Sequence, residues 1–466
     1  MWSLGGSLRA IVLGSLMMVW SAAAVAQEEE APPSAAATDP GTPANQVTQP
    51  ARPPSGGSGS RARGGTGIAL SEDGNARLHL GADAGVGFDT NPYVTPLASN
   101  EFTGDVVTRI RPRLELNAPG SMLAFRGTAS LDYGFLPGLV NPATQSYLLY
   151  QSNIGGDLEV NRGGTFTFAL GDSFSWNSDP GIANIGTLLN RIHNQARVGV
   201  GFRPGGGTLQ FRLGYAFDFF KWFDVQNRGG AIAEGALDSI GNTLQLRMDY
   251  RFLPKTGVFA ILGSGWTFYP FTTTQPQAFP VTALVGLQGQ VLPKLAGLVS
   301  IGYENPLVVD TLPGGGVGIA TATVIGVAGQ AELQWTPTPT TKLGGGFQRR
   351  FSPTALYQYL ANNRFYASLS QQVLGRFVLD ANAGYGILEF GEEQPTLAGG
   401  LTDTPVGRLD GQLDGNLQLS YYFVDWFSIG IQDRVQWRVT NAADALQGTN
   451  FSYLRNETLV LASVWY

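Results

Sequence analysis

The chain alternates apolar and polar side chains over most of its length after residue 76. In the segment LDGQLDGNLQLSY, for example, Leu409, Leu413 and Leu417 share one parity with two glycines, whereas Asp410 and Asp414 take the other. A period of two predicts β-strands whose two faces meet different surroundings. The alternating segments run for about 10 to 14 residues, roughly twice the usual strand length of a globular protein. Such strands are long enough to cross a membrane at an angle.

The connections between these segments alternate between short and long. Short turns fall near residues 118–121, 161–164, 203–207, 253–256, 292–295, 336–340, 374–376 and 423–426, and longer polar stretches lie between them. The pattern predicts about 18 strands, an even number with both chain ends on the short-turn side, as bacterial outer-membrane barrels require. We expect these strands at 76–88, 105–117, 122–135, 146–160, 165–176, 190–203, 208–220, 240–253, 257–268, 279–291, 296–304, 319–335, 341–351, 363–374, 376–389, 406–422, 426–438 and 453–466.

These features predict an all-β fold, a closed antiparallel transmembrane β-barrel over residues 76–466. A soluble β-propeller or a large sandwich also alternates inner and outer residues. The strand length, the alternation of short and long connections and the aromatic residues near strand ends favour the membrane barrel. In a membrane every backbone polar group must be paired, and a sheet achieves this only by closing.

The residues before the barrel have a different composition. Residues 1–26 combine one positive charge, a short apolar run and small residues before Gln27, which predicts a secretory signal peptide. An N-terminal membrane anchor is the alternative, but the apolar run is short of the ~20 residues that a spanning helix needs. Residues 27–75 are rich in Pro, Ala, Ser and Gly and predict a disordered periplasmic segment. We therefore expect the protein in the outer membrane of a Gram-negative bacterium, with its N-terminal segment in the periplasm.

Charge is sparse in this chain. Charged residues make up 14% of it, against about 25% in an average soluble domain. A barrel of about 18 strands encloses a water-filled lumen, and both signs of charge on the polar parity favour a hydrated solute of little net charge. The alternative is that these charges pair across neighbouring strands and only hydrate the wall. The predicted lumen-lining residues are Arg109, Arg111, Arg113, Arg126, Asp132, Arg197, Arg212, Arg247, Asp249, Arg251, Asp410, Asp414, Arg434 and Arg438.

One acidic residue falls on the parity that should face lipid. Asp433 shares that parity with Ile431 and Val435, and a charge at mid-depth on the lipid face is unfavourable. We expect either a bulge that shifts the register or a position near the lipid headgroups.

The sequence gives little support to enzymatic chemistry. His79 and His193 are the two histidines, they lie on distant predicted strands, and neither belongs to a nucleophile or metal-ligand motif. Cysteine is absent, and no basic stripe suggests nucleic acid. We expect no enzymatic activity, no cofactor and no metal site.

A short motif follows the first predicted strand. Asp89, Thr90, Asn91, Pro92 and Tyr93 resemble the D-(S/T/D)-N-x-(Y/F) element after strand one in an outer-membrane β-barrel porin family, which includes barrels encoded with exopolysaccharide and capsule secretion systems. The resemblance implies a porin that completes an export route with a periplasmic polysaccharide-export protein lacking its own outer-membrane segment. From the residues alone, the motif predicts an Asx-type turn that opens a long loop.

The final segment, NETLVLASVWY, predicts the closing strand. Val460, Ala462, Val464 and Tyr466 form its lipid-facing set, and the strand must pair with residues 76–88 to remove both free edges. A terminal aromatic after alternating apolar residues resembles the signal by which barrel proteins are recognised for outer-membrane insertion. These four residues are therefore the predicted assembly signal, and the barrel-assembly machinery is a predicted partner beside outer-membrane lipid.

Three functions are compatible with these observations. The family resemblance implies an outer-membrane export channel for a secreted polysaccharide, either exopolysaccharide or capsule. A general diffusion porin for small hydrophilic solutes is the second function, and it predicts a constriction built by an inward-folded long loop. A barrel enzyme acting on lipid or peptide is the third, and it would depend on the histidines.

Overall fold

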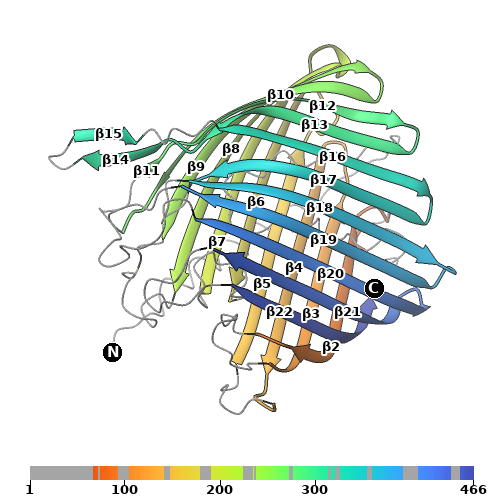
Figure 1. The fold of residues 1–466 in the computed structure, drawn as a ribbon. Helices are drawn as coiled ribbons and strands as arrows, with labels where there is room; N and C mark the ends of the chain where they lie inside the picture. The colour runs from red at the N-terminus through yellow and green to blue at the C-terminus, as the bar shows by residue number, and fades with distance from the viewer. Residues whose placement is uncertain are drawn as a thin grey trace, which may run out of the picture.

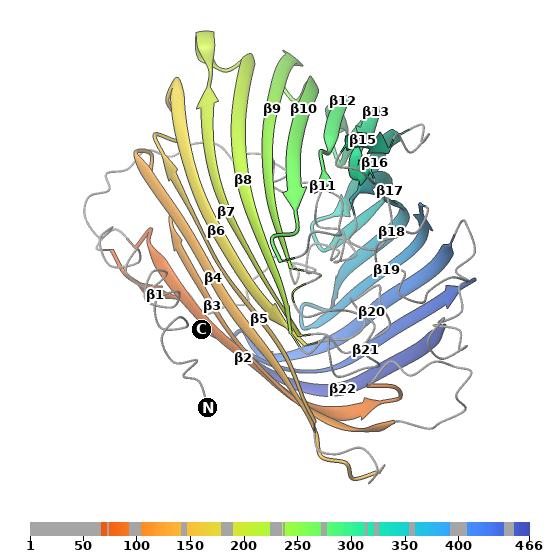
Figure 2. The ribbon, with the colours of Figure 1, turned by 90° about the vertical axis from the view of Figure 1, so that its left-hand side faces the viewer.

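The computed structural model of the chain describes residues 67–71, 74–92, 104–140, 147–178, 190–223, 235, 238–271, 277–312, 316–320, 326–353, 359–391, 408–441 and 452–466. These residues form one antiparallel sheet that closes into a barrel of 18 long strands (Figure 1). Figure 2 shows the sheet curving round until the last strand lies beside the first long one. Among the described residues, no helix is long and apolar enough to cross a membrane.

The predicted strands are found within a few residues of their expected bounds, with one exception. Each is followed by its neighbour in the sheet, as expected for a chain of hairpins. The barrel strands are β2 (Arg77–Asp89), β3 (Asp105–Ala118), β4 (Leu123–Leu136), β5 (Tyr147–Val160), β6 (Phe166–Asn177), β7 (Asn190–Phe202), β8 (Leu209–Phe223), β9 (Ser239–Leu253), β10 (Thr256–Phe268), β12 (Val281–Leu292), β13 (Leu295–Asn305), β16 (Val327–Thr338), β17 (Thr341–Ser352), β18 (Leu360–Val373), β19 (Phe377–Phe390), β20 (Leu409–Val424), β21 (Phe427–Thr440) and β22 (Tyr453–Trp465).

The exception lies between β13 and β16. The strand expected at 319–335 begins only at Val327, because residues before it form a separate hairpin of β14 (Val308–Leu312) and β15 (Gly316–Ala320). This hairpin attaches to the sheet through β11 (Gln277–Ala278). Two apolar runs separated by a glycine-rich stretch are a hairpin signal, and the prediction merged the second run with the following strand.

A second difference concerns the segment before the barrel. Residues 27–75 were expected to be disordered, but β1 (Ile68–Ala69) pairs with Arg77 and Leu78 of β2. β1 lies along the same edge of β2 as β22, next to the residues of β2 that β22 does not reach. A single turn of 3-10 helix, η3 (Pro204–Gly206), lies in the short connection between β7 and β8. The predicted signal peptide, residues 1–26, lies outside the described residues.

Closure of the barrel follows the predicted pairing of the two ends. β22 runs antiparallel to β2, from Trp465 opposite Gly81 to Glu457 opposite Asp89. Two backbone hydrogen bonds extend this pairing to the final residue, because Tyr466 N donates to Leu80 O at 2.7 Å and Leu80 N donates to Tyr466 O at 2.9 Å. The prediction that the final segment is the closing strand is confirmed.

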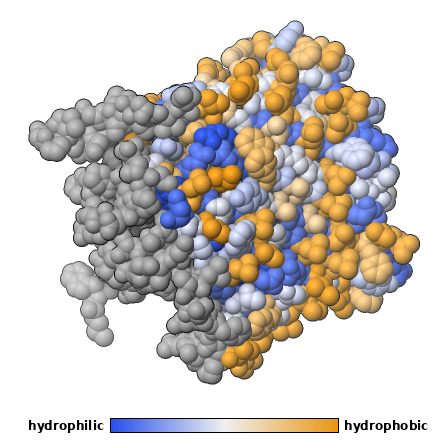
Figure 3. Space-filling view, viewed as in Figure 1, coloured by the Kyte–Doolittle hydropathy of each residue, from blue (hydrophilic) through white to orange (hydrophobic). Residues whose placement is uncertain are grey.

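The two faces of each strand differ as the alternation predicts. Outer positions carry large, exposed apolar side chains such as Ile110, Val285 and Ile301, and Figure 3 shows apolar groups spread widely over the outer surface. Inner positions on the same strands carry polar groups, and several are nearly fully buried, including Arg109 at 5% exposure and Ser300 at 6%. The apolar side chains of each strand therefore lie on the face that a membrane would cover, and the polar side chains lie on the face turned to the barrel interior.

Candidate functional site

One part of the inner wall is rich in arginine and acidic residues. It comprises the inner faces of β20, β21, β22, β2, β3 and β4, and we call it the arginine seam because it contains the contact between the first and last barrel strands. At its centre Arg109 donates from Nη1 to Asp132 Oδ1 at 2.9 Å and from Nε to Glu457 Oε2 at 2.8 Å. Arg111 donates to Asp132 Oδ2 at 3.0 Å and to Gln432 Oε1 at 2.8 Å. Four strands are thus linked by side chains as well as by the backbone.

A position without a side chain in β2 lets the closing strand pack closely against it. Gly85 lies opposite Arg109 on β3 and opposite Leu461 on β22. A Cβ at Gly85 would collide with the Leu461 side chain. The Leu461 side chain therefore occupies the inward space at Gly85, beside the contact that Arg109 makes across β2 with Glu457.

The predicted lumen-lining residues are placed on the inner face, and most of them pair with an opposite charge. Besides the pairs at the centre of the seam, the ion pairs are Arg113–Asp83, Arg126–Glu115 (3.2 Å), Arg197–Asp157 (2.9 Å), Arg212–Asp249 (3.1 Å), Arg247–Asp249 (2.9 Å), Arg364–Asp414 (2.7 Å), Arg408–Asp410 (2.8 Å), Arg438–Asp410 and Arg434–Glu457 (3.7 Å). Of the predicted set, Arg251 alone forms no ion pair with a residue that the structure describes. Most of these charges therefore neutralise one another along the wall.

The Asp89 motif forms the expected turn at the long-loop end of the seam. Asn91 N donates to Asp89 Oδ1 at 3.0 Å across two residues, which is the geometry of an Asx turn. Pro92 is buried beside it, and Tyr93 lies outside the described residues. The turn directs the chain out of β2 at the rim of the barrel.

The same motif also fastens the first barrel strand to the last. Asp89 Oδ2 accepts a hydrogen bond from Arg455 Nε at 2.9 Å, and Thr90 Oγ1 accepts one from Asn456 N at 2.8 Å. Asp89 and Arg455 are 0% and 5% exposed, so this is a buried ion pair. Sequence reasoning missed Arg455 because it lies 366 positions from Asp89. Its inward parity on the closing strand was the signal available.

Farther round the barrel, the inner wall carries few charges. It comprises the inner faces of β12, β13, β16, β17 and β18, and we call it the amide wall because glutamine is frequent there. Apart from Glu332, its charged residues lie toward the strand ends. Its inner positions include Thr282, Gln288 and Gln290 on β12, Ser300 and Glu304 on β13, Gln330, Glu332 and Gln334 on β16, Lys342, Gly344, Gly346, Gln348 and Arg350 on β17, and Arg364, Tyr366, Ser368, Ser370 and Gln372 on β18.

Glu332 stands at mid-height in the amide wall with neutral partners. Its carboxylate accepts hydrogen bonds from Gln334 Nε2 at 2.8 Å, from Tyr366 Oη at 3.1 Å and from Gln330 Nε2 at 3.5 Å. Within the described part of the chain it forms no ion pair. Sequence reasoning did not single out this group.

A model of the family described as "Putative beta-barrel porin 2" matches residues 80–456. The chain belongs to this family. It is an outer-membrane β-barrel porin-like protein, and such barrels are outer-membrane proteins of Gram-negative bacteria that are typically not enzymes.

The porin is also similar to solved outer-membrane proteins at low identity. The siderophore receptor PirA from Pseudomonas aeruginosa is 10% identical, with 84% of this chain and 80% of that one covered and a TM-score of 0.38. The FrpB iron transporter from Neisseria meningitidis is 8% identical, with 85% and 82% covered and a TM-score of 0.41. A bacterial polysaccharide outer membrane secretin is 10% identical, with 84% and 98% covered and a TM-score of 0.32. No curated protein matches the chain significantly.

The two histidines of the porin lie on the inner wall near opposite ends of the barrel. His79 stacks on Trp465 with 6.0 Å between ring centroids, so this tryptophan faces inward. His193 stacks on Phe220 at 4.0 Å and its Nε2 lies 3.0 Å from Asp218 Oδ1. Among the described residues, no group of three or more side chains has the composition and spacing of a metal site.

Asp433 lies on the outer face of the porin near the middle of β21. The pairing of β20 with β21 is continuous from Leu417 opposite Asp433 in both directions, so the expected bulge is absent at this point. Asp433 lies in the middle of the strand, between Ile431 and Val435, so the expected position near the lipid headgroups is also wrong. Thr458 Oγ1 donates to its carboxylate at 2.6 Å, which supplies one of the hydrogen bonds that lipid cannot.

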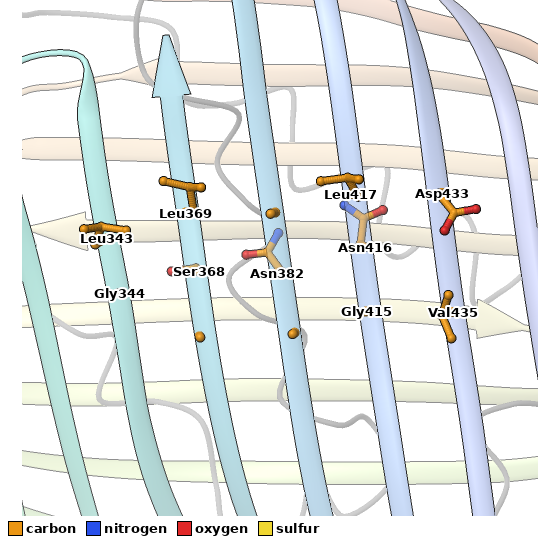
Figure 4. A pocket seen from close by; sticks show the side chains of 13 residues that line it. Leu343, Gly344, Ser368, Leu369, Asn382, Gly415, Asn416, Leu417, Asp433 and Val435 are labelled. Atoms are coloured by element: carbon orange, nitrogen blue, oxygen red, sulfur yellow. The ribbon is translucent and has the colours of Figure 1, made fainter.

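Small residues beside Asp433 hollow the outer surface into a shallow groove. The groove crosses β17 to β21, and Figure 4 shows its side chains on these neighbouring strands. Its outward-facing lining is Leu343, Ala367, Leu369, Ala381, Ala383, Gly415, Leu417, Asp433 and Val435. This mostly apolar surface suits lipid acyl chains.

Proposed function

We propose that this porin is the outer-membrane export channel for a secreted polysaccharide, exopolysaccharide or capsule, and works with a periplasmic polysaccharide-export protein. The observation that carries the proposal is the inner wall, which is hydrophilic but has its charges neutralised. Arg109, Asp132 and Glu457 illustrate this, because each cation of the cluster has a carboxylate within ion-pair distance. A filter built from a ring of charged side chains needs uncompensated charge, whereas a hydrated polymer of hydroxyl groups needs hydrogen-bonding groups along its path.

The placement of the chain ends suits a partner on the periplasmic side. In outer-membrane barrels the short turns face the periplasm, and β1 lies at the short-turn end of β2. β1 therefore lies at the periplasmic rim in this proposal. A secretory signal peptide over 1–26 and a periplasmic segment after it are part of the same proposal.

The motif at Asp89 adds a second line of support. Its resemblance to the element found in barrels encoded with exopolysaccharide and capsule secretion systems points to export rather than uptake. The motif itself does structural work in this porin, since it closes the barrel through Arg455. Transport in this proposal requires no catalysis and no cofactor.

A deletion strain tests the proposal directly. We expect loss of surface polysaccharide and accumulation of polymer in the periplasm. Both amounts should return to the wild-type level when the full-length gene is supplied in trans. An unchanged amount of surface polymer would rule out the export function. If uptake of small sugars or amino acids falls instead, the porin is a general diffusion channel.

A further inference from the structure

Three neighbouring strands of the amide wall place their inward residues in a regular array, and two positions of this array are glycines. Cross-strand pairing places residues of β16, β17 and β18 in three rows across the wall. The rows are Gln330, Gln348 and Arg364, then Glu332, Gly346 and Tyr366, then Gln334, Gly344 and Ser368. We call this array the Tyr366 patch.

The glycine in the middle row determines how Tyr366 lies. A Cβ at Gly346 would stand 2.6 Å from Tyr366 Oη and 2.7 Å from Cζ, so the ring rests directly on the β17 backbone. It crosses β17 to donate its hydroxyl proton to Glu332 on β16 at 3.1 Å. Tyr366 is half-buried, and the β17 backbone at Gly346 covers one side of its ring.

The polar groups around the ring keep unused hydrogen-bonding capacity. An ionised carboxylate offers about four acceptor sites, and Glu332 receives three donors, one of them at 3.5 Å. The Gln348 and Ser368 side chains form no hydrogen bond with any residue in the described ranges. In the arginine seam, by contrast, Arg109 already donates to Asp132 and Glu457.

We propose that the Tyr366 patch is a binding site for a neutral, hydroxyl-rich sugar residue of the transported polymer, an inference that rests on the proposed export function. The electron-rich face of the Tyr366 ring attracts the weakly positive C–H face of a sugar ring. Glu332 accepts hydrogen bonds from sugar hydroxyls, and the carboxamide of Gln348 both donates and accepts.

The same patch discriminates against acidic sugars. A uronate or sulfate group bound over Tyr366 would place a second negative charge beside Glu332, and like charges brought together in this way are repelled. No cation within the described residues pairs with Glu332 to offset this repulsion. The polymer that fits is therefore an uncharged glycan.

Single-channel recording on the full-length porin in planar bilayers tests the site. The probes are cellohexaose and dextran fragments as neutral sugars and hexagalacturonate as an acidic sugar of the same length. We expect the neutral probes to interrupt the current and hexagalacturonate to do so much more briefly. Tyr366→Ala should shorten the neutral-sugar residence time about tenfold, the effect of losing one good contact. Tyr366→Phe should retain most of the residence time because it keeps the ring.

A charge variant separates recognition from structural damage. Glu332→Gln should weaken the block by cellohexaose and lengthen the block by hexagalacturonate, an inversion that misfolding cannot produce. Thr128→Ala, which removes an exposed inner side chain from β4 in the arginine seam, is the matched control and should behave as wild type. Each variant must show the heat-modifiable gel mobility of a folded barrel.

The outcomes are distinct from those of the deletion experiment. Equal block by neutral and acidic probes, no block by any probe, or no change in Tyr366→Ala and Glu332→Gln would overturn the proposed site even if the deletion strain loses its polymer. Conversely, the purified porin could be blocked selectively by neutral sugars while the deletion strain keeps its surface polymer. That pair of results would support the binding site and rule out the export function.

Discussion

The arginine seam and the amide wall line one lumen but are held together differently. In the seam, charged side chains cross from strand to strand, as when Arg109 joins β3 to β4 and β22. In the amide wall, Glu332 at mid-height meets neutral donors, and Tyr366 and Ser368 lie over the glycines of β17. The ion pair of Arg350 with Glu304 lies toward the strand ends. In the arginine seam the polar groups bind one another, whereas in the amide wall several of them keep hydrogen-bonding capacity for a ligand.

The difference follows from where each wall comes in the chain. Neighbouring strands of the amide wall are close along the sequence, although the hairpin of β14 and β15 lies between β13 and β16. The seam contains the one pairing between chain ends, which no turn brings together and for which a long loop must close. Buried ion pairs are weak evidence for stability but can specify register. A one-residue slip of β22 would turn Glu457 outward to lipid and leave Arg109 with Asp132 as its remaining acidic partner.

The largest effect is expected at the end of the chain, where closure begins. Tyr466→Asp removes the terminal aromatic and places a charge on the outer surface, so the amount of assembled barrel in the outer membrane should fall several-fold or more. Conductance of the molecules that do insert should be close to wild type. Heat-modifiable mobility in membrane fractions measures assembly, with Leu374→Asp in an exposed short turn as the control. Normal insertion of the Tyr466 variant would contradict the assembly role.

The centre of the seam should be more sensitive to the loss of one carboxylate than the amide wall. Glu457→Ala removes one of the two carboxylates that bind Arg109 and the carboxylate that pairs with Arg434, and breaking buried pairs in this way should lower the free energy of unfolding by about 3 kcal/mol. Glu332→Ala, the matched change in the amide wall, should cost within about 1 kcal/mol because no ion pair is broken. Urea unfolding in liposomes followed by tryptophan fluorescence gives both values. Similar losses for the two variants would erase the distinction between the walls.

The rim of the seam offers a graded test. Asp89→Ala removes both the Asx turn and the ion pair with Arg455, and should lower the free energy of unfolding by about 2–3 kcal/mol. Asp89→Asn keeps the turn acceptor and loses the charge, so it should cost about half as much. If the two variants are equally unstable, the ion pair rather than the turn fastens the ends.

The smallest effect is expected where the amide wall is tightly packed. Gly346→Ala brings a methyl group against Tyr366 and the Ala331 carbonyl, which should cost about 1–3 kcal/mol and displace the ring. Gly345→Ala, one residue away on the outer face, meets nothing closer than 3.3 Å and should be nearly neutral. A Gly346 variant as stable as wild type, with unchanged sugar block, would show that the ring does not depend on this gap.

Much of the architecture was predictable because the signals that determine it are local. Each strand carries its own two-residue period, and lipid outside with water inside separates the two faces of every strand independently of its partners. The hairpin of β14 and β15 was missed for the same reason, since a short apolar run reads alike whether it continues a barrel strand or reverses on itself. The parity of Asp433 correctly predicted its outward position, but neither of the two expected reasons, a bulge or a place near the headgroups, is found.

The sequence by itself therefore determined the barrel, the number of its strands, the inward and outward sets and the pairing of the two chain ends. Tertiary structure decided which inward groups meet. Arg109 and Glu457 are 348 positions apart, and their contact depends on the register of β2 with both neighbours. The patch around Tyr366 likewise exists only because Gly346 falls between it and Glu332. A side chain's partner is set by alignment across strands, and no local pattern encodes that alignment.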